Sequence, residues 1–206
     1  VGLARAMLDD ACADGGDSEA ARLVNTPAFD KTRSGGYYPL HYACQNADAG
    51  MIELLFEHGA NPNVFKNNGA SPLMTAIFSC GRYTGLSPRD AYMCGRLDSD
   101  ESLKEYEECV RLLLEHPQFD LEANDRPTNS PVWCAVSQSW DSECDKLLPL
   151  LRLLLARGFS PDGEVHRLPA LYMAVRQNHF ECAKILIMAG ADTTQTAPAD
   201  GQPGSS

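Results

Sequence analysis

His41 and Cys44 are the two residues whose types and spacing come nearest to catalytic chemistry in this 206-residue chain. An imidazole can act as a general base for a thiol, and residues three apart on one helix can approach each other. Such a pair also needs a third group that orients the base, and none can be identified in the sequence. We therefore predict no catalytic residues and no enzymatic activity within the chain.

Eight cysteines invite a disulfide or metal interpretation, which their spacing does not support. The sequence has no CxxC and no Cys/His cluster with the short spacing typical of a zinc site. Several cysteines fall instead in helical apolar patterns, as in HYACQ (41–45), ECVRLLL (108–114) and ECAKILI (181–187). Because a free Cys behaves as a small buried hydrophobe, we predict structural thiols, no metal and no cofactor. Free thiols also favour a cytoplasmic or other reducing intracellular compartment.

Acidic residues outnumber basic ones by 28 to 17, which gives a formal net charge of −11. Nucleic acids and anionic membranes require a basic surface, so this balance argues against both as partners and leaves room for a protein partner. Acidity is also simply what keeps many soluble proteins in solution. No apolar run reaches the roughly 20 residues of a membrane span, so we predict no membrane insertion. The chain begins at Val1 without a signal-peptide pattern, and we expect a processed protein or a piece of a longer one.

An internal repeat is visible in four segments that each lead from a turn of small residues into a helix. These segments are YPLHYACQ (38–45), SPLMTAIF (71–78), SPVWCAVS (130–137) and PALYMAVR (169–176). Their central alanines lie 33, 59 and 39 residues apart, and a fainter copy at 7–14 lies 32 residues upstream of the first. A single helix pair cannot bury its apolar face alone, so stacked copies must supply the core.

The ends of the predicted helices carry the expected signals. Ser71 and Ser130 precede prolines, which suits a helix start because the hydroxyl can cap free N–H groups and Pro fits the first turn. Gly59, Gly158 and Gly190 fall just beyond later helices, where a left-handed residue is favoured. Each of the four copies, and the fainter copy at 7–14, is followed by a second helical pattern. These second patterns lie at 17–24, 50–63, 106–122, 147–162 and 179–194.

These TPLHxA-like helix starts, Leu-rich second helices and GADxN-like turns resemble the ankyrin-repeat family. The resemblance covers about 7–194, nearly throughout 38–63 and well in the second half of 169–194. It implies an all-α ankyrin-repeat solenoid of about five helix-turn-helix repeats, with a long insertion in the third repeat. It also accounts for His41, because the family's His at this position hydrogen-bonds within and between repeats. The implied domain, 1–194, divides into repeats at about 5–37, 38–70, 71–129, 130–168 and 169–194, and a disordered tail follows at 195–206.

The insertion covers about 81–106 and accounts for most of a 26-residue excess over the repeat length. Long loops are uncommon in compact domains and are often functional or disordered, so this one is either a binding element or a tolerated insertion. Its end could extend the following helix, which would then run from about 100 to 115. A smaller insertion at about 139–146 contains Trp140, which either covers the first insertion or anchors a partner.

The resemblance implies a protein–protein interaction module that binds a partner protein through a concave surface of fingers and inner helices. Two alternatives stay open: a structural subunit or scaffold of a larger assembly, and the targeting domain of a larger enzyme or channel. The partner's identity cannot be read from the sequence, because a fold does not fix a function. The candidate partner-binding residues are Tyr37, Gln45, Asn46, Asn67, Asn68, Phe78, Arg126, Asn129, Gln138, Trp140, His166 and Arg176.

The last predicted helix, about 180–189, reads FECAKILIMA. A terminal repeat needs a polar outer face, and this segment offers little of one. We expect this face to contact further polypeptide, a partner or a second copy.

Overall fold

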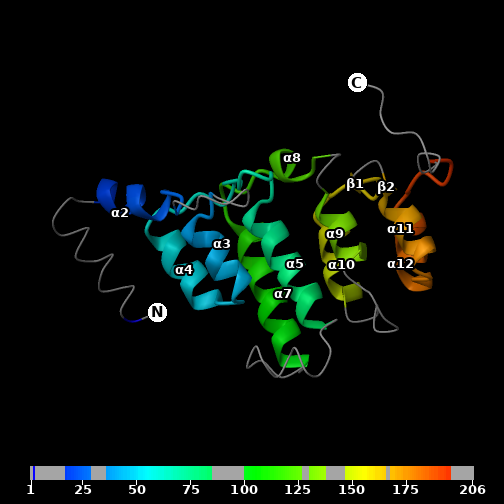
Figure 1. Cartoon of the computed structure of the whole chain (residues 1–206), viewed down its shortest axis with the longest axis horizontal. Coiled ribbons are helices and arrows are strands. Elements are labelled where there is room, and N and C mark those ends of the chain that lie inside the picture. The colour runs from blue at the N-terminus through cyan, green and yellow to red at the C-terminus, as the bar shows by residue number, and fades with distance from the viewer. Residues whose placement is uncertain are drawn as a thin grey trace. The chain divides into compact units, whose positions relative to one another are not determined.

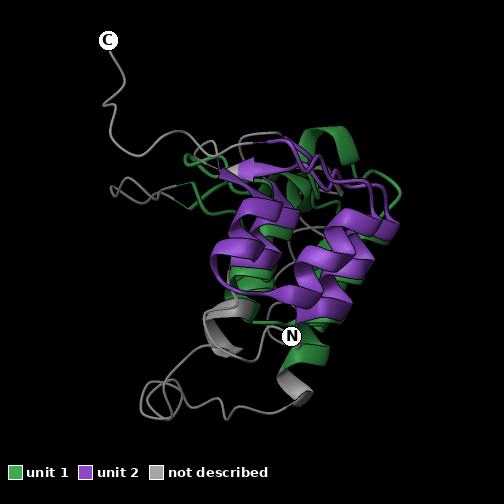
Figure 2. Ribbon diagram, turned by 90° about the vertical axis from the view of Figure 1, so that its right-hand side faces the viewer, with its two compact units in different colours: residues 1–124 green, residues 125–206 purple. Residues whose placement is uncertain are grey.

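The computed structural model describes residues 2, 17–28, 36–84, 100–126, 130–137, 147–165 and 168–195. The chain divides into two compact units, residues 1–124 and 125–206, shown in green and purple in Figure 2. Paired helices make up both units, and the strands found among the described residues are only two residues long. The predicted all-α fold class is confirmed.

Unit 1 is built from helices that pack in adjoining pairs (Figure 1). Helix α3 packs against α4 and α5, and α7 packs against α4 and α5, so the four share one core. Its fully buried side chains include Leu40, Cys44, Ile52, Leu54, Leu73, Ile77, Cys109 and Leu113. The elements are α2 (Asp17–Val24), α3 (Pro39–Gln45), α4 (Ala49–Glu57), α5 (Pro72–Thr84), α7 (Asp100–Glu115) and α8 (Leu121–Asn124).

Helix α7 begins at Asp100 and ends at Glu115, as the extended helix at 100–115 was predicted to do. Of the predicted insertion, residues 81–84 belong to α5 and residues 100–106 to α7, and the rest lies outside the described residues. Tyr106, which the sequence places at the edge of the insertion, is a core residue and is 1% exposed. Its hydroxyl donates a 2.9 Å hydrogen bond to the carbonyl oxygen of Gln45, so it ties α7 to the end of α3.

The predicted helix ends are confirmed. The hydroxyl oxygens of Ser71 and Ser130 accept hydrogen bonds from the third backbone N–H after each, at 3.3 and 3.4 Å. Gly59, Gly158 and Gly190 have φ values of 78°, 96° and 93°, a left-handed conformation that costs glycine little.

Unit 2 repeats the same construction. Helix α11 packs against α9 and α12, and α10 packs against α9 and α12. A short antiparallel hairpin, in which Glu164 pairs with Pro169 and Val165 with Leu168, lies at one end of these helices (Figure 2). The elements are α9 (Pro131–Ser137), α10 (Leu148–Ala156), β1 (Glu164–Val165), β2 (Leu168–Pro169), α11 (Ala170–Arg176) and α12 (Phe180–Met188).

A series of Asn and Asp side chains, here called the Asx ladder, connects the turn after one helix pair to the turn after the next. Each side-chain oxygen accepts a backbone N–H from the following turn. In unit 1, Asn25 accepts from Asn61 at 2.8 Å and Asn63 accepts from Asp120 at 2.9 Å. In unit 2, Asp125 accepts from Ser160 at 2.8 Å and Asp162 accepts from Asp192 at 2.7 Å. The ladder satisfies turn N–H groups that have no partner within their own helix pair.

The five cysteines that the structure describes are all free and buried, as predicted. Burial raises the pKa of the Cys80 thiol to about 12, with a smaller contribution from the nearby Glu107 carboxylate. Burial likewise raises the pKa of Cys44 well above its ordinary value. These thiols stay protonated near neutral pH and therefore make poor nucleophiles. The five are Cys44, Cys80, Cys109, Cys134 and Cys182.

Candidate protein-binding surface

Tyr37 lies in the segment that leads into α3 and is held by aromatic neighbours. Its ring centroid is 5.0 Å from that of Tyr42 and 6.0 Å from that of His41. Its backbone carbonyl accepts a 2.7 Å hydrogen bond from Ala28 N–H, which joins this segment to the chain after α2. The Tyr37 ring is thus positioned in advance of any partner, which lowers the entropic cost of using it as an anchor.

Lys66 approaches Tyr37 from the turn between α4 and α5. Its Nζ atom lies 4.2 Å from the centroid of the Tyr37 ring, within the range of a cation–π interaction. The lysine is only 9% exposed, and its backbone N–H and carbonyl oxygen bond to Ala70 and Gly69. A Cβ atom on neighbouring Gly36 would meet the Asn67 side chain at 2.9 Å, so the two segments are in close contact.

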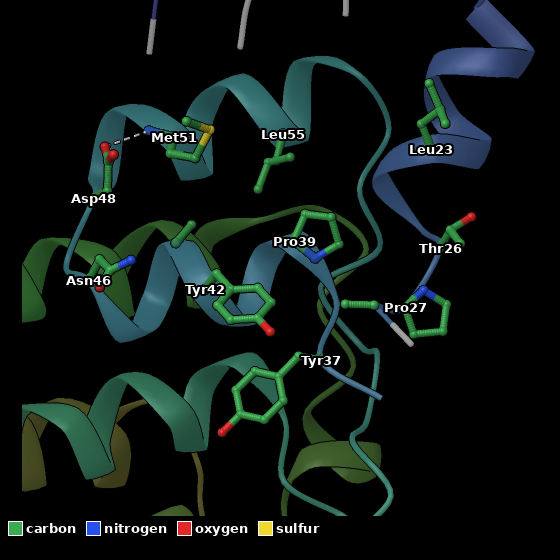
Figure 3. Close-up of a pocket in the computed structure, with 12 residues that line it drawn as sticks. Leu23, Thr26, Pro27, Tyr37, Pro39, Tyr42, Asn46, Asp48, Met51 and Leu55 are labelled. Atoms are coloured by element: carbon green, nitrogen blue, oxygen red, sulfur yellow. Dashed lines mark hydrogen bonds between the residues drawn. The ribbon is translucent and has the colours of Figure 1, made fainter. Parts of the chain in front are cut away.

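An open groove of about 610 Å³ lies beside this cluster (Figure 3). Tyr37 and Tyr42 form one side of the groove, and Met51 and Leu55 of α4 form another. Leu23 of α2, which is 43% exposed, lines a third side of the groove. The remaining lining is also largely apolar, and comes from Thr26, Pro27, Ala28, Pro39, Ala43, Asn46 and Asp48.

Asp48 is the one carboxylate among the groove-lining residues, and the structure gives it a local role. Its Oδ1 accepts a 2.9 Å hydrogen bond from Met51 N–H, which caps the start of α4. The groove therefore offers apolar and aromatic surface with a polar edge, which suits an apolar side chain of a partner better than a charged one.

His41 is buried beneath Tyr37 and has a structural role. Its Nδ1 accepts from Tyr38 N–H at 3.3 Å, and its Nε2 lies 3.1 Å from the carbonyl oxygen of Ala70. Burial lowers the pKa of His41 to about 4. A neutral imidazole at His41 and a protonated thiol at Cys44 do not form the ion pair of an activated nucleophile.

Several of the predicted partner-binding residues meet around the groove. Tyr37 and Asn46 line it, and Asn67 lies against Gly36 at its edge. Asn68 is exposed in the same turn, where its side chain accepts the Ala70 N–H at 3.1 Å. Gln45 is exposed at the end of α3. All five residues belong to unit 1, and two of them line the groove.

The other predicted residues that the structure describes do not line the groove. Phe78 is partly buried on α5. Arg126 and Arg176 are exposed in unit 2. Asn129, Gln138, Trp140 and His166 lie outside the described residues, so their roles stay predictions.

Most of the groove lining was not predicted from the sequence, including Tyr42, Met51 and Leu55, and neither was Lys66. A signal for Tyr42 exists, because Tyr37, Tyr38 and Tyr42 are spaced so that aromatic rings can meet over one helix turn. Lys66 is the one lysine or arginine between Arg33 and Arg82, but nothing in the sequence indicates its contact with Tyr37.

Comparison with known proteins agrees with this architecture. The profile of a family described as "Ankyrin repeats (3 copies)" matches residues 8–86 and 102–197, well over half of the chain. This chain belongs to the ankyrin-repeat family. Ankyrin repeats are generally protein–protein interaction modules and are themselves non-catalytic. The two matched stretches are separated at 87–101, inside the segment predicted as an insertion.

Three relatives show how far the similarity extends. A probable E3 ubiquitin-protein ligase, XBOS33, from Oryza sativa subsp. japonica is 31% identical over 210 residues, covering 91% of this chain and 38% of the relative. The human 2-5A-dependent ribonuclease is 48% identical over 45 residues, covering 22% of this chain and 6% of the enzyme. Mouse ankyrin repeat and SOCS box protein 16 is 38% identical over 60 residues, covering 28% and 13%. The chain thus spans well under half the length of each relative.

Within the ranges that the structure describes, no helix combines the length and the apolar character needed to cross a membrane.

Proposed function

We propose that this ankyrin-repeat chain binds a partner protein through the surface around the groove in unit 1. The observation that carries the proposal is the apolar groove of about 610 Å³ with two Tyr rings, Tyr37 and Tyr42, 5.0 Å apart at its edge. Tyrosines are common energetic anchors in interfaces, because they bury a large area at a low cost in side-chain entropy. The exposed amides of Asn67 and Asn68, which follow Lys66 in the chain, supply polar contacts near Tyr37.

The partner should insert an apolar side chain between the tyrosines and the aliphatic residues Met51 and Leu55. Lys66 acts on the partner indirectly, because its ammonium group lies over Tyr37 and fixes that ring. We extend the proposal to a non-catalytic role, to partners other than nucleic acid, and to a cytoplasmic or other reducing compartment, which the buried free thiols support.

The test begins with affinity capture and mass spectrometry to identify a partner, followed by calorimetric titration of purified variants. Tyr37→Ala and Tyr42→Ala should each weaken binding by about 1–2 kcal/mol, roughly 5- to 30-fold. Glu53→Ala, which changes an exposed residue of α4 that does not line the groove, is the matched control and should bind normally. Normal affinity in both Tyr variants, with an intact fold by circular dichroism, would show that the partner uses another surface.

Residues 1–16 provide a second arm of the experiment. The predicted first helix of the chain, at 7–14, lies outside the described residues, and stacking on α3 would bring it to the groove. If the groove receives a partner, deleting 1–16 should leave both affinity and melting temperature nearly unchanged. A lower melting temperature together with tighter binding would mean that the chain's own N-terminal residues compete for the groove.

A second candidate function is the targeting part of a larger enzyme. The observation that favours it is the similarity to the rice protein named as a probable E3 ubiquitin-protein ligase, which extends over 91% of this chain. Because the chain covers only 38% of that relative, the ligase activity does not transfer with the repeats. Precipitating the native protein from its source and assaying ubiquitin transfer would test this candidate, and a native polypeptide of the mass of this chain alone would contradict it.

A further inference from the structure

Four large apolar side chains are exposed on the last two helices. Val175 at the end of α11 is 66% exposed, and on α12 Phe180 is 74%, Ile187 51% and Met188 79% exposed. Exposed apolar patches of this extent mark interaction sites more often than they occur by chance. The sequence led us to expect contact with other polypeptide here, and the exposure of these residues is consistent with it.

The internal repeat shows that this surface is a packing face. Residues of α11 and α12 correspond to residues of α3 and α4 at a constant offset of 131 positions, from Ala43 and Ala174. The offset is supported by the backbone, since Ala47 and Asn178 both have positive φ, of 53° and 60°, as do Gly59 and Gly190. The two helix pairs can therefore be compared position by position.

In the α3–α4 pair, the positions that correspond to Val175, Ala183 and Ile187 are covered by the next helix pair, whereas Ala49, the counterpart of Phe180, is partly exposed. Cys44 and Ile52 are 0% exposed, and the Phe56 ring centroid lies 4.2 Å from that of His116, the residue directly after α7. Their counterparts in the last pair are Val175, Ala183 and Ile187, and here the outer two are exposed. The last helix pair thus presents a face that the fold elsewhere buries against helices.

We propose that this face, defined by Val175, Phe180, Ala183 and Ile187, binds the same face of a second copy of the chain. Along α12 the apolar ridge is nearly symmetric about a small residue, because Phe180 precedes Ala183 by three positions and Ile187 follows it by four. When two such helices cross antiparallel at Ala183, Phe180 meets Ile187 of the partner subunit. This arrangement is the self-complementary contact of a two-fold dimer.

A hollow of about 150 Å³ lies next to the ridge and supports this pairing. Val175, Phe180 and Ala183 contribute its apolar lining, and Ala174, Asn178 and His179 complete it. The two-fold contact places Ile187 of the partner subunit over this hollow. Its side chain would then fit between α11 and α12, in the way that side chains of packed helices interlock.

The charge of this face permits a second copy, and its area limits how tightly the copy can bind. The chain as a whole carries −11, but residues 170–188 contain Arg176 and Lys184 against the single carboxylate of Glu181, so the face is not acidic. The exposed parts of Val175, Phe180 and Ile187 correspond to on the order of 350 Å² per copy, and about 700 Å² for a pair lies below the size of stable interfaces, so the contact should be weak. The dimer should accordingly be reversible, with a Kd in roughly the micromolar range.

The test is sedimentation of the full chain over about 1 to 200 µM, which brackets a micromolar Kd. The mass should rise from 22.4 kDa toward twice that value with concentration. Phe180→Glu and Ile187→Glu should each weaken the dimer at least tenfold, since a carboxylate at either position would be buried unpaired. Gln118→Glu, which adds the same charge at an exposed residue of unit 1 outside the groove, is the control and should dimerise normally.

A symmetric crosslink provides an independent measurement. Ala183→Cys should form an intermolecular disulfide under mild oxidation, because each Ala183 lies next to Ala183 of the partner subunit. The parent chain, whose described thiols are buried, should form none through this helix. A chain that stays monomeric over the whole range, or a dimer that survives both Glu substitutions, overturns the proposal, and the binding function proposed for the groove would stand in either case.

Discussion

The Nε2 atom of His41 lies 3.1 Å from the carbonyl oxygen of Ala70, a residue 29 positions later in the turn before the next helix pair. Because Nδ1 of the same ring accepts the Tyr38 N–H, the proton must sit on Nε2, and the neutral imidazole donates to Ala70. A second proton on Nδ1 would break the bond to Tyr38. Burial and the hydrogen bond from Tyr38 therefore favour the neutral imidazole, and they outweigh the bond to Ala70, which by itself raises the pKa of His41.

This arrangement predicts that acid destabilises the protein through His41. The pKa falls from 6.5 to about 4 on folding, so the unfolded chain binds the proton more tightly. The stabilisation is fully present above about pH 6.5 and is lost as the pH falls toward 4, by about 2 kcal/mol between pH 7 and pH 5. Urea unfolding at the two pH values measures this loss.

His41→Gln is the matched variant, because its amide can still donate to Ala70 but does not titrate. The variant should lose less stability than the parent between pH 7 and pH 5, by about the same 2 kcal/mol. Equal losses in the two proteins would show that His41 is not the group responsible.

The Asx ladder predicts a large effect of Asn63→Ala. Asn63 Oδ1 accepts from Asp120 N–H, and its Nδ2 donates to the carbonyl oxygen of Gln118 at 2.6 Å. Removing both leaves turn groups without partners, at a cost of about 2–3 kcal/mol in the free energy of unfolding. Chemical denaturation is the measurement, with Asn68→Ala as the control because the exposed Asn68 bonds within its own turn. Similar losses in the two variants would contradict a special role for the ladder.

Gly163→Ala should destabilise unit 2 through a steric clash. A Cβ atom at Gly163 would clash with the Cβ atom and the hydroxyl oxygen of Ser130, which is fully buried. Overpacking of this kind costs about 1–3 kcal/mol. Ser130→Gly alone should cost a few tenths, since glycine is a tolerated helix cap. Thermal unfolding of the double variant should recover much of the loss, and strictly additive effects would argue against the clash.

Thiol titration offers a test of the core. The sequence has eight cysteines, and five of them are buried, with the pKa of Cys80 raised to about 12 by burial. An aromatic disulfide reagent at pH 8 should therefore react rapidly with at most three thiols in the folded protein and with all eight in denaturant. Fast reaction of more than three without denaturant would show that the helix packing opens readily.

Local patterns allowed the repeat register to be predicted, because each repeat encodes its own turns and caps. The Ala43 to Ala76 spacing and the glycines at 59, 158 and 190 predicted helices and left-handed caps that the structure contains. Contacts between repeats could not be predicted from local patterns in the same way. Lys66 lies over Tyr37 because of how a turn folds back, and no pattern within either segment indicates it.

Helix ends and core positions near the predicted insertion could be predicted only in part from the sequence. Helix α5 continues to Thr84, past Gly81, where the insertion was expected to begin. The three residues that follow Gly81 in the helix include neither glycine nor proline, so nothing in them ends the helix earlier. Tyr106 was assigned to the insertion by its position, although its partner is the carbonyl group of Gln45, 61 residues away. Whether a tyrosine lies in a loop or in a core depends on such distant groups.

The Asx ladder also bears on how this protein could be engineered. Asn25 bonds to a residue 36 positions later, whereas Asn63 makes the equivalent bond across 57 positions. Neighbouring turns are therefore held together by direct bonds that do not depend on how many residues run between them. The chain should consequently tolerate an inserted fluorescent reporter, or the new termini of a circular permutant, between α5 and α7. A reporter at that position could convert a binding event into an optical signal.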